Sequence, residues 1–311
     1  MGLPGYTGVK DLGFRFTNRK RAPGSYNPQV PWCLLALAGF LGAEAGSLTI
    51  TTRSREVAPG EIVIVTIAST TPIATPKVRA FEQDLTPFAE NDRTWRVLVG
   101  IDIDTKPGKH LVTIDAGGER RTHLLLVAPK QFPTRRLTVD QAFVDPPESA
   151  KKRIDDESKL VASLWNASLP ERLWTDPFVR PVPHAANSAF GTRSIFNGQP
   201  RSAHGGADFL SPAGTPVRAP NAGRVVLVRN LYYSGNTVIV DHGLGVFSYF
   251  AHLSEMTVAE GESVKPGVVI GAVGATGRVT GPHLHWTVRV SNARVDPLAL
   301  LALLGEPSKE K

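Results

Sequence analysis

Short runs of apolar and β-branched residues, separated by glycine and proline turns, dominate the first half of the chain after residue 46. The run at residues 62–67 follows the turn Pro59-Gly60, and the run at 110–114 ends before a pair of glycines. Runs of this length between such turns predict strands. With similar runs at 95–103 and 122–127, residues 46–129 are expected to form a β-rich, sandwich-like domain.

The hydrophobic pattern changes between residues 130 and 183. Prolines punctuate a polar stretch, and residues 148–164 carry apolar side chains at helical spacing among runs of opposite charge. This pattern predicts a linker that contains a solvated helix. Trp165 and Trp174 are expected to pin the linker onto the region that follows.

Residues 184–311 return to short apolar runs divided by glycine and asparagine turns. The sequence therefore predicts a mainly all-β protein: a sandwich-like domain, a helical linker and a C-terminal antiparallel sheet. The expected strands of this last region lie at residues 216–220, 223–228, 237–240, 246–250 and 284–288.

The start of the chain has the layout of a secretory signal peptide. Basic residues precede an apolar core at residues 32–41, and Ala43-Glu44-Ala45 fits the small-x-small rule for cleavage. We expect residues 1–45 to be removed and the protein to be exported to the periplasm, cell envelope or outside of the cell. An uncleaved anchor or a buried helix would show a similar pattern. No later segment is apolar and long enough to suggest a stable membrane span.

The net charge limits the kinds of partner that the protein is expected to bind, and the cysteine content limits its disulfides. The formal net charge is +7, but lysine and arginine are scattered without interleaved aromatic residues or a nucleic-acid motif. A mildly basic solvated surface is expected, with no nucleic acid as partner; an anionic wall polymer would suit that surface. The single cysteine, Cys33, excludes a disulfide within the chain.

Histidine spacing carries the candidate chemistry. Five of the eight histidines lie between residues 204 and 285, and two of them form the sequence His283-Leu284-His285. On a strand, residues two apart point to the same face, so both imidazoles would face one spot. In His204-Gly205-Gly206-Ala207-Asp208, the glycines allow a bend that aims both end residues at one point.

Two imidazoles and one carboxylate form a three-ligand set for Zn²⁺ with the fourth position open, as in catalytic zinc sites. Such a metal activates a water molecule, and a base must take its proton. The sequence has no HExxH motif. His252 and His283 are therefore the candidates for proton transfer, and His242, in an Asp-His-Gly turn, is expected to be structural.

Three motifs in order resemble the M23 peptidases, the lysostaphin and LytM type of peptidoglycan endopeptidase. They are His204-x-x-x-Asp208, His252-Leu253-Ser254 and His283-x-His285. The resemblance covers roughly residues 187–300. Framing sequences at family-like distances are Phe190-Gly191-x-Arg193, Asn197-Gly198, residues 214–220, Asp241-His242-Gly243, Gly271-x-Val273-Gly274 and Thr276-Gly277.

The resemblance implies a zinc metalloendopeptidase that hydrolyses peptide cross-links or stem peptides of bacterial peptidoglycan. It implies one zinc ion per chain, held by His204, Asp208 and His285, with His252 and His283 in catalysis. It also implies a compact antiparallel sheet with an open groove. Residues 184–311 are expected to act without residues 46–129.

Several alternatives stay open at this stage. A non-catalytic LytM-type module that activates wall amidases would share the fold, and the complete ligand set argues against it. A basic face that only tethers the protein to the wall is a weaker option. Arg193 and Asn197 would line the substrate groove or merely fix their loop. The bond that is cut, whether a D-alanyl–diaminopimelate cross-link, another stem bond or a glycine bridge, and the oligomeric state are not predicted.

Overall fold

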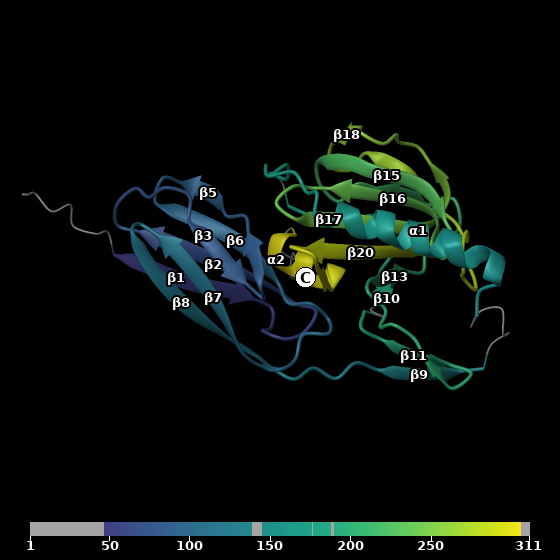
Figure 1. Ribbon diagram of the computed structural model, residues 1–311. Helices are drawn as coiled ribbons and strands as arrows, with labels where there is room; N and C mark the ends of the chain where they lie inside the picture. Colours follow the sequence, from purple (N-terminus) through teal and green to yellow (C-terminus); the bar gives the residue numbers. More distant parts are fainter. Residues whose placement is uncertain (1–46, 139–144, 176, 188–189, 306–311) are drawn as a thin grey trace, which may run out of the picture. The chain divides into compact units, whose positions relative to one another are not determined.

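Alternation of buried and exposed side chains builds the first β-rich region. The computed structural model describes residues 47–138, 145–175, 177–187 and 190–305, so the predicted signal peptide at 1–45 lies outside the described residues. Two four-stranded antiparallel sheets follow (Figure 1). One has the order β1 (Leu48–Ser54), β2 (Ile62–Ser69), β6 (Thr94–Gly100), β5 (Phe88–Asn91); the other has the order β4 (Gln83–Leu85), β3 (Lys77–Ala80), β7 (Gly108–Ala116), β8 (Glu119–Val127).

The two sheets share one core, as a sandwich requires. Val63 and Val65 of β2 pack in the same buried cluster as Val112 and Ile114 of β7. The strand expected to continue through residues 101–103 ends at Gly100 instead. Ile101 and Ile103 are buried, but the backbone leaves the sheet there, and the Ile101 N–H donates to the Glu61 carbonyl at 2.9 Å.

A ten-stranded sheet carries the C-terminal region. Its central strand is β20 (Leu284–Val290), which pairs with β13 (Ala207–Phe209) on one side and β17 (Val246–Met256) on the other. Beyond these lie β10 (Ala186–Asn187), β16 (Gly235–Asp241), β15 (Gly223–Leu231) and β18 (Ser263–Val264) in the order β10-β13-β20-β17-β16-β15-β18, with β14 (Pro216–Arg218), β19 (Val269–Val273) and β21 (Ala293–Val295) attached.

Two helices accompany the sheets. Helix α1 spans Glu148–Leu164, the range predicted from its apolar spacing, and lies across β15–β17 in Figure 1. Leu160, Val161, Leu164 and Trp165 pack against a small core that includes Phe247. The opposite face carries (i, i+4) ion pairs such as Lys152–Asp156. Helix α2, Pro297–Leu304, begins at Asp296, whose side chain caps the Leu298 N–H.

The linker contributes a strand that the sequence did not predict. Strand β9 (Thr134–Leu137) pairs in parallel with β11 (Arg193–Phe196), which also pairs with β12 (Gln199–Pro200). Phe132, just before β9, lies over Gly191, where any β-carbon would overlap its ring. The linker therefore supports the segment that leads to His204.

Buried charges join the first and last parts of the chain. Glu61 is fully buried and accepts hydrogen bonds from Arg55 and Lys130, while Arg55 also donates to Asp296 at 2.7 Å. Arg294 forms a two-point ion pair with Asp102. The described residues accordingly belong to one compact unit.

The mainly β fold class is confirmed. The domain boundaries at 129 and 184 stay predictions, as does independent action of residues 184–311. Ile62, Ile64 and Leu98 of the sandwich belong to the same buried cluster as Trp286 and Val288, so a chain without residues 46–129 would expose part of that core. No helix among the described residues has both the length and the apolar character needed to cross a bilayer.

Candidate metal centre

Strand pairing brings two of the predicted ligands together. Asp208 on β13 is directly opposite His285 on β20, so their side chains project from the same face of the sheet. Asp208 Oδ1 lies 2.9 Å from His285 Nδ1. The pairing register of two short strands therefore explains the contact between residues 77 positions apart.

His204 reaches the same point from the loop before β13. Its backbone N–H donates to the Thr192 carbonyl, and its own carbonyl accepts from the Gly191 N–H. Gly206 allows the close approach, since a β-carbon there would lie 2.5 Å from the Trp286 carbonyl oxygen. His204 Nε2 then lies 3.1 Å from Asp208 Oδ1 and 2.9 Å from His285 Nδ1.

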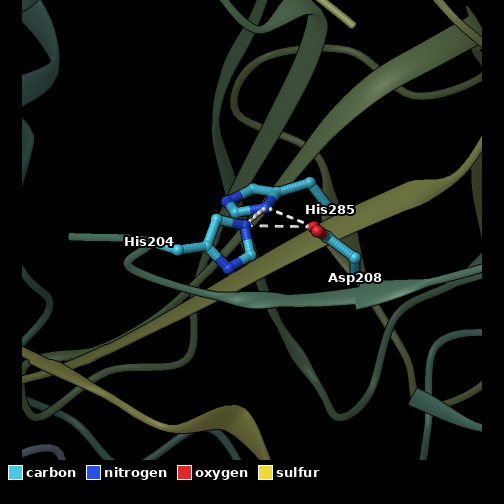
Figure 2. A group of neighbouring side chains, drawn as sticks. All are labelled: His204, Asp208 and His285. Atoms are coloured by element: carbon cyan, nitrogen blue, oxygen red, sulfur yellow. Dashed lines mark hydrogen bonds and ion pairs between the residues drawn. The ribbon is translucent and has the colours of Figure 1, made fainter. Parts of the chain in front are cut away.

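The three side chains fit a metal ion. Figure 2 shows His204, Asp208 and His285 converging with one ligand atom each, and these atoms lie within 4.8 Å of one another. Tetrahedral Zn²⁺ with bonds of about 2.0–2.1 Å holds its ligand atoms roughly 3.3 Å apart, close to the separations found here. Two imidazole nitrogens and a carboxylate oxygen also form the donor set of catalytic zinc sites.

A further residue, Thr287, orients one of these imidazoles. Its Oγ1 lies 2.9 Å from His285 Nε2. When His285 Nδ1 binds a metal, the ring proton is on Nε2, and the Thr287 hydroxyl accepts it in a hydrogen bond. The sequence motifs do not include Thr287, although its position two residues beyond His285 on the same strand places it on the same face.

His252 reaches the site because its strand is irregular. Ala251 pairs with His285, so a regular strand would turn the next side chain to the opposite face of the sheet. His252 instead has a left-handed backbone, with φ of 63°, at a break in the pairing of β17 with β16. Its ring centre consequently lies 6.0 Å from that of His285 and 4.9 Å from that of His283.

Backbone carbonyls set the proton positions on His252 and His283. His252 Nδ1 lies 2.9 Å from the Thr276 carbonyl oxygen, and His283 Nδ1 lies 2.9 Å from that of Gly281. A carbonyl only accepts, so each Nδ1 carries a proton, and in the neutral ring each Nε2 keeps its lone pair. His283 Nε2 points towards Asp208 Oδ1 at 3.8 Å.

Burial and hydrogen bonds together set the protonation states of Asp208, His285 and His252. Burial alone would raise the pKa of Asp208, but hydrogen bonds and charges from His204 and His285 hold that pKa well below its usual range. Burial lowers the pKa of His285. Burial, followed by the charge of His285, lowers the pKa of His252 to about 4, so both imidazoles are neutral near pH 7.

The other predicted residues lie in different settings. Arg193 starts β11 with its guanidinium 3.7 Å from Asp104 of the sandwich. Asn197 occupies a left-handed turn position after β11 and donates its N–H to the Leu137 carbonyl. His242 is fully buried between the Ala222 carbonyl and the Ser248 hydroxyl, in agreement with a structural role.

Comparison with known proteins adds to this geometry. A model described as Peptidase family M23 matches residues 202–297. Peptidoglycan DD-endopeptidase ShyB of Vibrio cholerae is 42% identical over 95 residues, which cover 30% of this chain and 22% of that protein. DD-carboxypeptidase/endopeptidase Mpg of Neisseria meningitidis is 44% identical over 97 residues, covering 31% and 22%. The chain thus spans about a fifth of these curated relatives.

One solved structure matches over a much larger share. A crystal structure described as a peptidase M23 from Pseudomonas aeruginosa is 31% identical, has a TM-score of 0.64, and is matched over 79% of this chain and 95% of that one. The fold and the His-His-Asp cluster, with these similarities, define a metallopeptidase. This chain belongs to peptidase family M23, as the motifs predicted.

Proposed function

We propose that the protein is an exported, zinc-dependent endopeptidase that hydrolyses peptide cross-links or stem peptides of bacterial peptidoglycan. The observation that carries the proposal is the convergence of His204, Asp208 and His285, with two further histidines beside them. The names of the relatives from Vibrio and Neisseria support peptidoglycan as the substrate.

His204, Asp208 and His285 would hold one zinc ion. Bound zinc supplies a Lewis acid that polarises the scissile carbonyl and lowers the pKa of a water molecule. The neutral His285 imidazole and the ionised Asp208 carboxylate are already in their metal-binding states near pH 7. Thr287 would keep His285 in the tautomer that offers Nδ1.

His252 and His283 would move protons and stabilise charge at the reacting carbonyl. Each offers an unprotonated Nε2, because Nδ1 is committed to a backbone carbonyl, and His283 Nε2 lies 3.8 Å from Asp208 Oδ1. One neutral imidazole can take the proton of the attacking water, and the other can donate once it is protonated. We assign the general base to this pair. Arg193 and Asn197 remain candidates for the groove wall.

The envelope is the proposed site of action. Peptidoglycan lies outside the cytoplasmic membrane, and the leader pattern at residues 1–45 would deliver the protein there. The runner-up function is a non-catalytic module that activates wall amidases. The complete set of ligand and proton-transfer residues favours the enzyme.

Mass spectrometry of fragments released from purified sacculi tests the proposal. The parent protein should release stem peptides separated at one type of bond, and chelation of its metal should abolish release. A His285→Ala protein serves as the matched control. A parent protein that contains zinc but releases nothing, while it raises the activity of a wall amidase, would support the binding module instead.

A further inference from the structure

Two arginines lie on two separate segments that each include or contact a residue of the metal centre. Arg201 comes three residues before His204. Arg278 comes two residues after Thr276, whose carbonyl accepts the hydrogen bond from His252 Nδ1. Arg201 therefore belongs to the segment that carries the metal ligand His204. Arg278 belongs to the segment whose carbonyl orients His252.

Several contacts hold the segment of Arg278 beside His252. The Arg278 N–H donates to the Tyr233 carbonyl at 2.8 Å, and the Arg278 guanidinium lies 4.2 Å from the centre of the Tyr233 ring. A β-carbon on Gly277 would lie 2.5 Å from that same carbonyl oxygen. Ser234, next in the chain, accepts a hydrogen bond from the His252 N–H. Stacking on an aromatic ring orients the plane of a guanidinium and so prepares it for two-point binding.

Arg201 is also partly buried and held by its backbone. Its N–H donates to the Ser194 carbonyl at 2.8 Å, and one terminal nitrogen donates to Gln199 Oε1 at 3.2 Å. Its Nε is buried and has no hydrogen-bond partner among the residues that the structure describes. A buried donor without a partner costs free energy that a bound acceptor would recover.

The positive charge of one guanidinium group affects the pKa of the other. Burial lowers the pKa of Arg278; the Tyr233 side chain partly offsets this effect, and the positive charge of Arg201 lowers the pKa further. Two like charges that lie near each other repel. An anion between them would relieve this repulsion and could accept a hydrogen bond from the Arg201 Nε, and paired arginines bind carboxylates in this way.

We propose that Arg201 and Arg278 together bind a carboxylate of the substrate close to the scissile amide. This assignment rests on the proposed function and narrows its substrate class. In a D-alanyl–diaminopimelate cross-link, the carbon that bears the amide nitrogen also bears a free carboxylate. In a glycine bridge, the corresponding carbon bears no such group. The arginine pair therefore selects cross-links that carry a free carboxylate beside the cleaved bond.

Two synthetic cross-linked peptides test the assignment with the full-length protein. They are identical except that one has a free carboxylate on the carbon beside the cleaved amide and the other has a carboxamide. A hydrogen bond to a charged group is worth about 1.5–3 kcal/mol, which corresponds to roughly 10–150-fold. We expect Arg201→Gln and Arg278→Gln each to lower kcat/KM by about that factor for the carboxylate peptide. For the carboxamide peptide, the expected change is at most about threefold.

Matched variants separate charge recognition from structural damage. Arg278→Lys should retain part of the preference for the carboxylate, because it keeps the charge but not the two-point geometry. Arg229→Gln removes an arginine of β15 that pairs with Glu260, and it should behave as the parent on both peptides. Zinc content should stay at the parent value in all four variants.

The outcomes are distinct. Equal losses on both peptides would show that the arginines only support the fold, which overturns the assignment. A parent protein that cleaves both peptides equally well, with unchanged glutamine variants, overturns the carboxylate site and leaves the proposed function standing. A parent that cleaves neither peptide nor sacculi overturns the proposed function and this assignment with it.

Discussion

The sandwich and the C-terminal sheet are built from the same kinds of strand, yet they differ in regularity. In β7 and β8 of the sandwich, nine consecutive residue pairs keep one register from Gly108↔Val127 to Ala116↔Glu119. In the C-terminal sheet, β17 shifts register against β19 between Leu253 and Glu255, and against β16 between Phe250 and Leu253. His252 lies at the break against β16. The regular region provides a stable surface, whereas the irregular region places an imidazole where a regular strand would not.

Removal of a metal ligand from the C-terminal sheet should have the largest effect on zinc content and hydrolysis, and a histidine change in the sandwich should have none. His285→Ala is expected to lose both zinc and hydrolysis, because two remaining ligands hold zinc poorly. Elemental analysis and a cleavage assay measure the two losses together. His110→Ala in the sandwich is the matched control and should keep both. Zinc at full occupancy in the His285→Ala protein would contradict the ligand assignment.

The next largest effect should be a loss of cleavage rate, without loss of zinc, when a proton-transfer histidine is replaced. His252→Asn is a suitable change, because asparagine tolerates the left-handed backbone found there. We expect the cleavage rate to fall by about 10²–10⁴-fold while zinc content stays near the parent value. His283→Ala should behave similarly. Normal turnover by either variant would exclude the proposed role of that histidine.

A smaller effect should come from the hydroxyl that orients His285. Thr287→Val keeps the shape of the side chain and removes the acceptor for Nε2, so zinc affinity should fall by about 10–100-fold. Competition with a chelator measures the affinity. Thr113→Val on the paired strands of the sandwich provides the control and should leave zinc affinity unchanged.

The last expected effect is on stability rather than on the metal site: a pH dependence that centres on His242. Burial lowers the pKa of His242 to about 4, whereas the unfolded chain binds a proton near pH 6.5. As the pH falls from about 6.5 towards 4, the unfolded state takes up a proton that the folded state does not, so the free energy of unfolding decreases. This contribution is at most about 3 kcal/mol.

Urea denaturation of the metal-free protein at several pH values measures this slope. His242→Asn should be less stable than the parent at pH 7, because it alters a fully buried hydrogen-bonded site. The difference between the two proteins should shrink as the pH falls. Identical pH slopes for parent and variant would show that His242 is not the group responsible.

Sequence patterns were informative where chemistry depends on local spacing. The spacing of His204, Asp208, His283 and His285 indicated a cluster, and the structure brings these residues together. Helix α1 followed from its apolar period. Other features depend on contacts between distant segments. The left-handed backbone of His252 lies where β17 shifts register against β16, and no local sequence pattern predicts it. Strand β9 has four exposed residues and forms only because β11 lies beside it.

The ion pair between Arg55 and Asp296 has a consequence for how the protein is made. It joins residues 241 positions apart, and the metal cluster itself joins His204 to His285. Contacts of such long range form late and slowly in folding. A nascent chain that has not yet reached His285 and Asp296 has neither the third ligand nor the ion pair. The proposed hydrolytic activity would therefore arise only after both residues have been synthesised.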